Sequence, residues 1–244
     1  MIFRLLTVGM IICICCIQAR ADEVNGTSAS GTQAIPDNNM VGVTSTVTIT
    51  GMQIAAGQKV IAADFCINLR HTWIGDLVVT VQKGMGPVAT LFARVGRMGM
   101  GNGFSSNLGR LDGQNVTQTG EYQFKDGGTD LWGEAAIGGT DYFSRSVEIA
   151  GDPNPYRAVN ADSSANVVSL NTIFQNVDPI GAWTFTVTDL NGTVVGFLGE
   201  TSVHLVTVPE PGTVAGIVML SMFGGVYFRR RHLAKKKLTT PSPV

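Results

Sequence analysis

The sequence predicts an all-β protein built around a two-sheet sandwich, and three observations support this fold class. Apolar and polar residues alternate with a period of two over several stretches, which is typical of strands that bury one face. Clusters of Gly, Asn, Asp and Pro separate these stretches, as turns between strands require. No stretch between them has the period of an amphipathic helix, so we expect two sheets packed face to face.

The expected strands follow one another along the chain, with loops between them. Residues 96–113 are rich in glycine and, like residues 152–162, are predicted to form a loop. Residues 22–34 are rich in small and polar residues, so we expect a flexible linker there and the folded domain over residues 35–207. The apolar positions that define the strands are Val43, Val47 and Ile49; Ile61, Ala63, Phe65, Ile67 and Leu69; Leu77, Val79 and Val81; Trp183, Phe185 and Val187; Val203 and Leu205.

Threonine occupies every second position from Thr44 to Thr50 in the first of these strands. A regular row of threonines can match a repetitive ligand such as ice or a polymer. A single strand does not form an array, however, and Thr is a common outward-facing residue in strands. We therefore interpret this ladder as an ordinary strand surface.

The N-terminal residues 1–21 have the organisation of a secretory signal peptide. Arg4 supplies the positive charge, residues 5–17 the apolar core, and Ala19-Arg20-Ala21 the small-x-small cleavage site. Asp22 would then begin the mature protein, which would keep Cys66 as its one cysteine and could form no internal disulfide. Because Cys66 alternates with apolar neighbours, a buried thiol is favoured over a nucleophile.

The C-terminal residues 208–244 combine a short motif, an apolar run and a basic end. The motif is Pro209-Glu210-Pro211, the run covers residues 212–228, and Arg229, Arg230 and Arg231 follow it. A helix over the run would extend about 25 Å, slightly less than a hydrocarbon core. A buried core helix is the alternative, but the cluster of Lys and Arg behind the run opposes it. Such clusters stay cytoplasmic, so we predict a transient membrane anchor with the rest of the chain outside.

This tail resembles the PEP-CTERM sorting signal of exported bacterial proteins. The resemblance implies recognition by an exosortase, a membrane transpeptidase, and removal of the tail near Pro209-Glu210-Pro211. It also implies delivery to the cell surface or to an extracellular polysaccharide matrix.

Two segments of the body resemble the P domain (P/Homo B) that accompanies subtilisin-like proprotein convertases. They are His71-Thr72-Trp73-Ile74-Gly75-Asp76-Leu77-Val78-Val79 and Gly181-Ala182-Trp183-Thr184-Phe185-Thr186-Val187-Thr188-Asp189. The resemblance covers roughly residues 35–206 and implies a jelly-roll sandwich of eight or nine strands. The P domain is not itself catalytic, and the protease domain that it accompanies is absent from these motifs. The resemblance therefore does not imply serine endopeptidase activity.

Several polar and aromatic residues are candidates for a structural or binding role. His71 and Gly75 are expected to be structural, and Trp73 and Trp183 to anchor the core, with a sugar-stacking platform as the alternative. Trp132 lies in an irregular region and is the candidate for an exposed aromatic. Four aspartates stand at strand ends or in turns, where capping of backbone N–H groups is favoured and structural calcium is the alternative. They are Asp76, Asp126, Asp130 and Asp189.

The charge and the motifs of the sequence argue against two classes of function, nucleic-acid binding and catalysis. Residues 22–211 contain all 18 acidic residues but only nine of the 17 Lys and Arg, so the exported body is strongly acidic although the whole chain carries −1. This composition argues against binding to nucleic acid. The body has only His71 and His204 and no G-x-S-x-G elbow, so we expect no catalytic residues and no enzyme. We expect an exported structural or adhesive protein. The alternative is a binding module, either for carbohydrate in a calcium-dependent manner or for a protease partner.

Overall fold

The computed structural model describes residues 21–29, 31–54, 57–97, 103–109, 120–136, 155–159, 167–192, 194, 196–210, 223–225 and 227. The chain is divided into two compact units. Asp22–Thr207 forms one, and the two terminal segments Met1–Ala21 and Val208–Val244 form the other. The first unit is the folded body.

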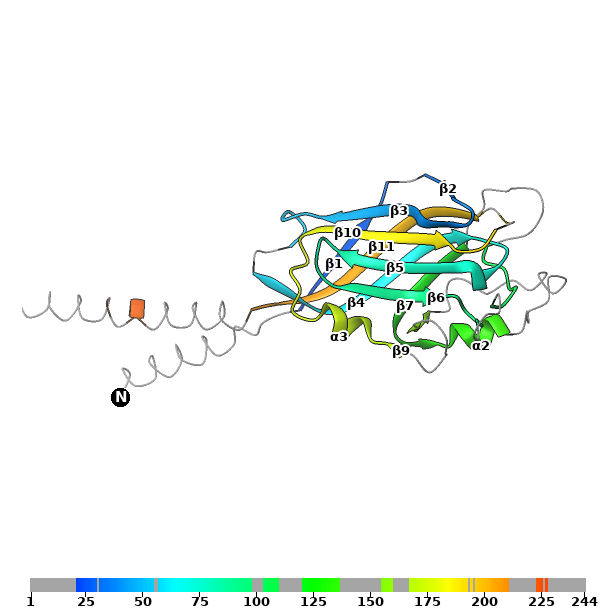
Figure 1. Ribbon diagram of the computed structural model, residues 1–244. Helices are drawn as coiled ribbons and strands as arrows, with labels where there is room; N and C mark the ends of the chain where they lie inside the picture. Colours follow the sequence, from blue (N-terminus) through cyan, green and yellow to red (C-terminus); the bar gives the residue numbers. More distant parts are fainter. Residues whose placement is uncertain are drawn as a thin grey trace, which may run out of the picture. The chain divides into compact units, whose positions relative to one another are not determined.

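Two antiparallel sheets form the body and lie face to face (Figure 1). Sheet A has the order β1-β11-β4-β7, with β2 also pairing with β11, and sheet B has the order β3-β10-β5-β6. Sheet A contains β1 (Asp22–Thr27), β2 (Gln33–Ile35), β4 (Gln58–Arg70), β7 (Gly120–Thr129) and β11 (Gly196–Pro209). Sheet B contains β3 (Asn39–Ile49), β5 (Leu77–Lys83), β6 (Val88–Ala93) and β10 (Gly181–Asp189).

Short elements complete the body. A single 3-10 turn, η1 (Ile74–Asp76), precedes β5, and β8 (Ala158–Val159) pairs with β9 (Val167–Val168). Two helices, α2 (Leu131–Ala136) and α3 (Leu170–Phe174), follow β7 and β9. These helices have only five or six residues, too few to produce a helical period that the sequence could reveal. The expected loop over 152–162 is corrected in part, because β8 lies within it.

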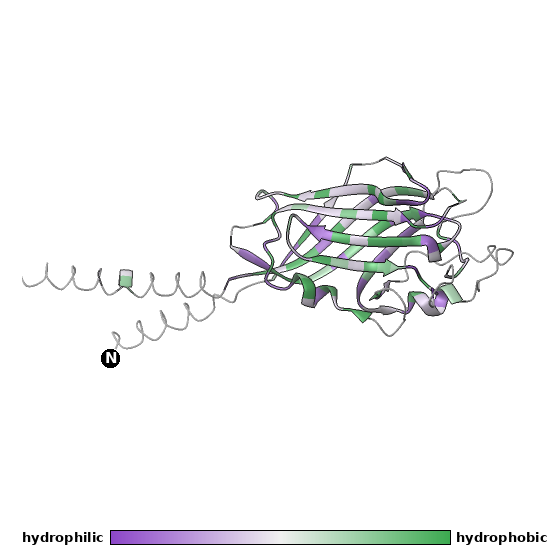
Figure 2. Cartoon of the chain, in the orientation of Figure 1, coloured by the Kyte–Doolittle hydropathy of each residue, from purple (hydrophilic) through white to green (hydrophobic). Residues whose placement is uncertain are grey.

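The core lies between the two sheets. Apolar and polar residues alternate along the strands, so each sheet turns one apolar face inward (Figure 2). The ring of Phe65 on β4 lies 5.8 Å from that of Trp183 and 5.9 Å from that of Phe185, both on β10. The predicted all-β, jelly-roll-type sandwich is therefore confirmed, with nine strands in its two main sheets.

The expectation of a flexible linker over residues 22–34 is wrong. Residues 22–27 form β1, which pairs with β11 from Asp22 opposite Thr207 to Thr27 opposite Ser202. β2 pairs with the other end of β11, and Val24 and Ile35 are buried. A small-residue composition disfavours a core of its own, but here the edge of β11 supplies backbone partners for a polar segment.

The predicted signal peptide, residues 1–21, lies outside the described residues except for Ala21. The same is true of Pro211, Arg229, Arg230 and Arg231, and of nearly all of the predicted membrane run 212–228. Among the residues that are described, no helix is long and apolar enough to cross a membrane. The two terminal signals remain predictions.

Candidate functional site

The two P-domain-like motifs meet at His71 and Asp189. His71 directly follows β4, and Asp189 ends β10. The Nε2–H of His71 donates to Oδ2 of Asp189 at 3.0 Å, and both side chains are 0% exposed. The N–H of Trp73 lies 3.1 Å from Nδ1 of His71. Because the carboxylate can only accept, Nε2 must carry a proton in this pair.

Asp76 places a second carboxylate beside this pair. It is buried at the end of η1, and its carbonyl oxygen accepts from the N–H of Leu190, next to Asp189. The pKa of Asp76 is raised to about 6, chiefly by burial and to a smaller extent by the charge of Asp189, while His71, a hydrogen bond from Asn191 and Arg94 oppose the rise. Within the described structure, Oδ1 of Asp76 has no hydrogen-bond partner.

Arg94 is a buried cation close enough to interact electrostatically with both carboxylates. It is buried just after β6, and burial lowers its pKa, while the charges of Asp76 and Asp189 raise it. We call His71, Asp76, Arg94 and Asp189 the buried polar cluster. Two carboxylates, one guanidinium group and a histidine thus lie buried inside the protein, where unpaired charge is costly.

The loop over residues 103–109 closes this cluster. The N–H of Gly75 donates to the carbonyl of Phe104 at 3.0 Å. A Cβ at Gly103, where φ is +76°, would lie 2.6 Å from the carbonyl oxygen of Val95 and 2.7 Å from Cα of Gly75, so this position requires glycine. Trp73 and Trp183 are buried, in agreement with their expected role in the core. The cluster thus pairs a histidine with a carboxylate, and all four of its side chains are buried.

The other two candidate aspartates serve different elements. Asp126 on β7 accepts from the Oγ–H of Ser169 at 2.7 Å and from the N–H of Leu170 at 2.8 Å, so it caps the start of α3. Asp130 accepts from the N–H of Trp132 and forms an ion pair with Arg157 at 3.1 Å. Among the described residues, no three His, Cys, Asp or Glu are grouped so as to hold a metal ion. The calcium alternative therefore gains no support from this part of the chain.

Trp132 is not the exposed aromatic that the sequence suggested. It lies in α2 and is buried, with its ring 6.2 Å from that of Phe104 in an edge-to-face arrangement. The segment has no strand period because it is helical, and six residues are too few to reveal a helical period. Tertiary contacts with the 103–109 loop bury the indole.

The outer face of sheet B presents a feature that sequence reasoning missed. The threonines of β3 stand opposite those of β10: Thr46 faces Thr184, and Thr44 faces Thr186. The row continues, because Thr186 faces Thr80 on β5, which faces Thr90 on β6. We call this surface the threonine face; its members are Thr44, Thr46, Thr48, Thr80, Thr90, Thr184, Thr186 and Thr188, all exposed or half-exposed.

The threonine face carries no charged side chain among its described outward positions. The other outward positions include Met40, Gly42, Val78, Gln82, Val88 and Ala182. The hydroxyls of Thr46 and Thr184 lie 3.3 Å apart. The second Thr-x-Thr-x-Thr run, Thr184 to Thr188, is visible in the sequence, but nothing local indicates that it pairs with the first.

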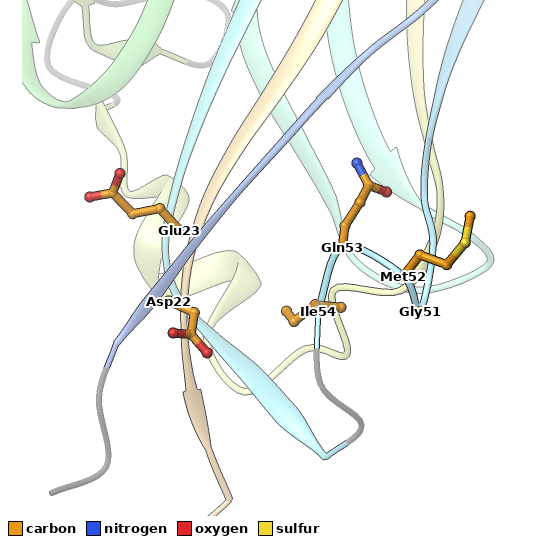
Figure 3. A pocket seen from close by; sticks show the side chains of 6 residues that line it. All are labelled: Asp22, Glu23, Gly51, Met52, Gln53 and Ile54. Atoms are coloured by element: carbon orange, nitrogen blue, oxygen red, sulfur yellow. The ribbon is translucent and has the colours of Figure 1, made fainter.

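A shallow pocket of about 440 Å³ lies elsewhere, between the start of β1 and the loop after β3. Figure 3 shows the carboxylates of Asp22 and Glu23 on one side and the side chains of Met52 and Gln53 on the other. Gln53 Nε2 donates to the carbonyl of Asn25 at 3.0 Å, so the loop is tied to β1. No nucleophile or base other than these carboxylates lines the pocket.

Comparison with known proteins adds little beyond this geometry. No family model and no curated protein matches the chain. A solved complex of the Aeromonas sobria serine protease with its chaperone has 16% identity and a TM-score of 0.39, covering 77% of this chain and 27% of that one. The serine protease of Aeromonas sobria has 13% identity and a TM-score of 0.40, covering 78% and 27%. This chain thus spans little more than a quarter of either chain, and at these scores the P-domain resemblance stays a prediction.

Proposed function

We propose that this chain is an exported, exosortase-processed protein of the cell surface or extracellular matrix, with a structural or adhesive body that performs no catalysis. The observation that carries the non-catalytic part is the burial of the His71–Asp189 pair. Both side chains are 0% exposed, so the described groups best suited to acid–base chemistry cannot reach a substrate.

The export part rests on the two terminal signals. The last strand, β11, continues to Pro209, and Glu210 is exposed just beyond it. An extended, proline-containing segment that follows a strand directly suits the cleft of a processing enzyme. The motif would therefore be presented at the boundary of the folded body.

Mass spectrometry of the protein recovered from the cell surface tests the export proposal. We expect a chain that begins at Asp22 and has lost the residues after the Pro209-Glu210-Pro211 motif. The Pro209→Ala and Glu210→Ala variants should retain the tail and stay in the membrane fraction. Recovery of surface protein with an intact C-terminus at Val244 would contradict processing.

The non-catalytic part is tested with a panel of peptide and glycoside substrates. We expect no turnover above that of a heat-unfolded control. Asp189→Asn removes the buried carboxylate, and His204→Ala removes an exposed histidine. Turnover that is lost in the first variant and kept in the second would refute a purely structural body.

Binding of a neutral carbohydrate polymer is a second candidate function, and the threonine face favours it. Neighbouring strands lie about 4.8 Å apart, so the row from Thr44 to Thr90 offers one hydroxyl per strand at a regular spacing. An uncharged glycan that lies across the strands could bond to each hydroxyl in turn. Because no aromatic side chain stands among the described outward residues of sheet B, stacking would not contribute, and many weak contacts along a polymer are needed.

A pull-down with insoluble neutral polysaccharides, with and without a calcium chelator, tests this second function. Binding through hydroxyls alone should persist after chelation. Thr186→Lys should abolish it, whereas Thr27→Lys, an exposed threonine on β1 in sheet A, should not. Equal binding by both variants would exclude the threonine face, and loss on chelation would favour the calcium-dependent alternative.

A further inference from the structure

The two ends of the folded body are locked together. Asp22 and Thr207 are direct partners in the β1–β11 pair. The hydroxyl of Thr207 donates to Oε1 of Gln58 at 2.8 Å and lies 3.2 Å from the carbonyl of Asp22. Gln58 Nε2 donates in turn to the Asp22 carboxylate. The chain therefore enters and leaves the body at one place, which we call the exit end.

Two exposed methionines lie at the exit end. Met52, in the loop after β3, is 94% exposed and lines the same pocket as Asp22 (Figure 3). Met85, at the tip of the β5–β6 turn, is fully exposed. The N–H of Gly84 in this turn donates to the carbonyl of Ala182 at the start of β10. The neighbouring residue, Gly181, pairs with Ile49 at the end of β3. The turn therefore lies at the end of sheet B from which the loop carrying Met52 leaves. Neither methionine contributes to the core.

The length of chain beyond the body limits how far this end can lie from a membrane. Only four residues, 208–211, lie between Thr207 and Gly212, where the apolar run begins, so five Cα–Cα steps join the two. Fully extended, they span at most about 17 Å. If the run is inserted as the proposed function requires, the exit end must stay within that distance of the bilayer surface.

We propose that the exit end docks on the lipid bilayer in the unprocessed protein, with Met52 and Met85 entering the boundary between headgroups and acyl chains. This inference rests on the proposed membrane insertion of the tail. Two methionines bury little area, and the carboxylates of Asp22 and Glu23 at the same end disfavour an anionic surface. The contact therefore orients a body that the tail holds in place, and removal of the tail releases the body.

The test uses the chain from Asp22 to Val244 in phosphatidylcholine vesicles. Cys66, the one cysteine of this form, is replaced by serine, and an environment-sensitive fluorophore is attached to a cysteine at position 52, 85 or 40. Met40 is the matched control because it is 86% exposed and lies at the opposite end of β3, next to the Asn39–Asp189 pair. Nitroxide-labelled lipids should quench the labels at 52 and 85 and leave the label at 40 unquenched.

The outcomes separate this inference from the proposed function. Failure of the chain to float with the vesicles would refute insertion of the tail. Flotation with equal quenching at all three positions would refute docking of the exit end while leaving insertion intact. A further label at Val88, beside the β5–β6 turn, should lose its quenching when Met52→Asp and Met85→Asp are introduced together. Unchanged quenching in that double variant would also overturn the inference.

Discussion

The Nε2 atom of His71 lies 3.0 Å from Oδ2 of Asp189, although 118 residues separate them in the chain. His71 follows the last residue of β4 in sheet A, and Asp189 is the last residue of β10 in sheet B. The hydrogen bond therefore ties the two sheets together inside the sandwich. It also explains why two motifs so far apart in sequence belong to one structural unit.

Loss of the imidazole should strongly destabilise the fold. His71→Ala leaves the Asp189 carboxylate buried without its main partner, which typically costs about 3–5 kcal/mol. His204→Ala is the control, because its ring lies 3.6 Å from Asp64 and 3.8 Å from Glu23 at the surface, where such pairs contribute less than about 1 kcal/mol. Urea unfolding measures both variants. Similar losses of unfolding free energy in the two variants would show that the buried pair stabilises the fold no more than the surface pairs do.

Asp76 should make stability depend on pH in the acidic range. Its pKa is raised from 3.8 to about 6, so the folded state binds the proton more tightly than the unfolded state does. The resulting stabilisation is complete below about pH 4, falls as the pH rises to about 6, and is absent above it. It amounts to roughly 2–3 kcal/mol. The measurement is urea unfolding of the wild type and Asp76→Asn at pH 4 and pH 7.

Between pH 4 and pH 7, Asp76→Asn should lose less stability than the wild type does, because an amide does not titrate. Asp126→Asn serves as a comparison, since that carboxylate caps α3 at a part-buried site. A wild-type pH dependence that survives unchanged in Asp76→Asn would assign the effect to another group.

Cys66 should react slowly with thiol reagents. Its pKa is raised to about 11, chiefly by partial burial, with smaller rises from the carboxylates of Glu121 and Asp64 and an opposing hydrogen bond from Ser202. At pH 8 this shift leaves about a hundredfold less thiolate than an ordinary cysteine has. Alkylation by iodoacetamide, followed by mass spectrometry, should therefore be slow in the folded form and fast in urea. Equal rates would argue against a protected thiol.

The segment misread as a linker should prove essential to stability. Val24→Asp places a carboxylate at a buried position of β1 and should cost at least about 2 kcal/mol. Asn25→Asp adds the same charge on the exposed face of the same strand and should change stability by less than about 0.5 kcal/mol. Thermal unfolding compares the two. A tolerated Val24→Asp would restore the linker interpretation.

Much of the core could be read from the sequence, because a half-buried strand must alternate. Phe65, Ile67 and Leu69 on β4, like Trp183 and Phe185 on β10, are buried as that period predicts. β1 was not predicted because its partner strand, β11, lies some 180 residues away in the sequence. Pairing with the edge of a distant strand overrides the preference of the local composition. Trp132 was misplaced because its burial depends on tertiary contact with Phe104, which the local pattern around Trp132 does not reveal.

The sequence by itself determined the strand class, the terminal signals that we expect, the acidic body and the two P-domain-like motifs. These follow from residue type and spacing, which act locally along the chain. Only the tertiary structure decided that His71 and Asp189 share one buried bond, that Asp22 and Thr207 lie side by side, and that two threonine runs form one face. Register between distant strands decides all three, and local sequence does not encode which edges will meet.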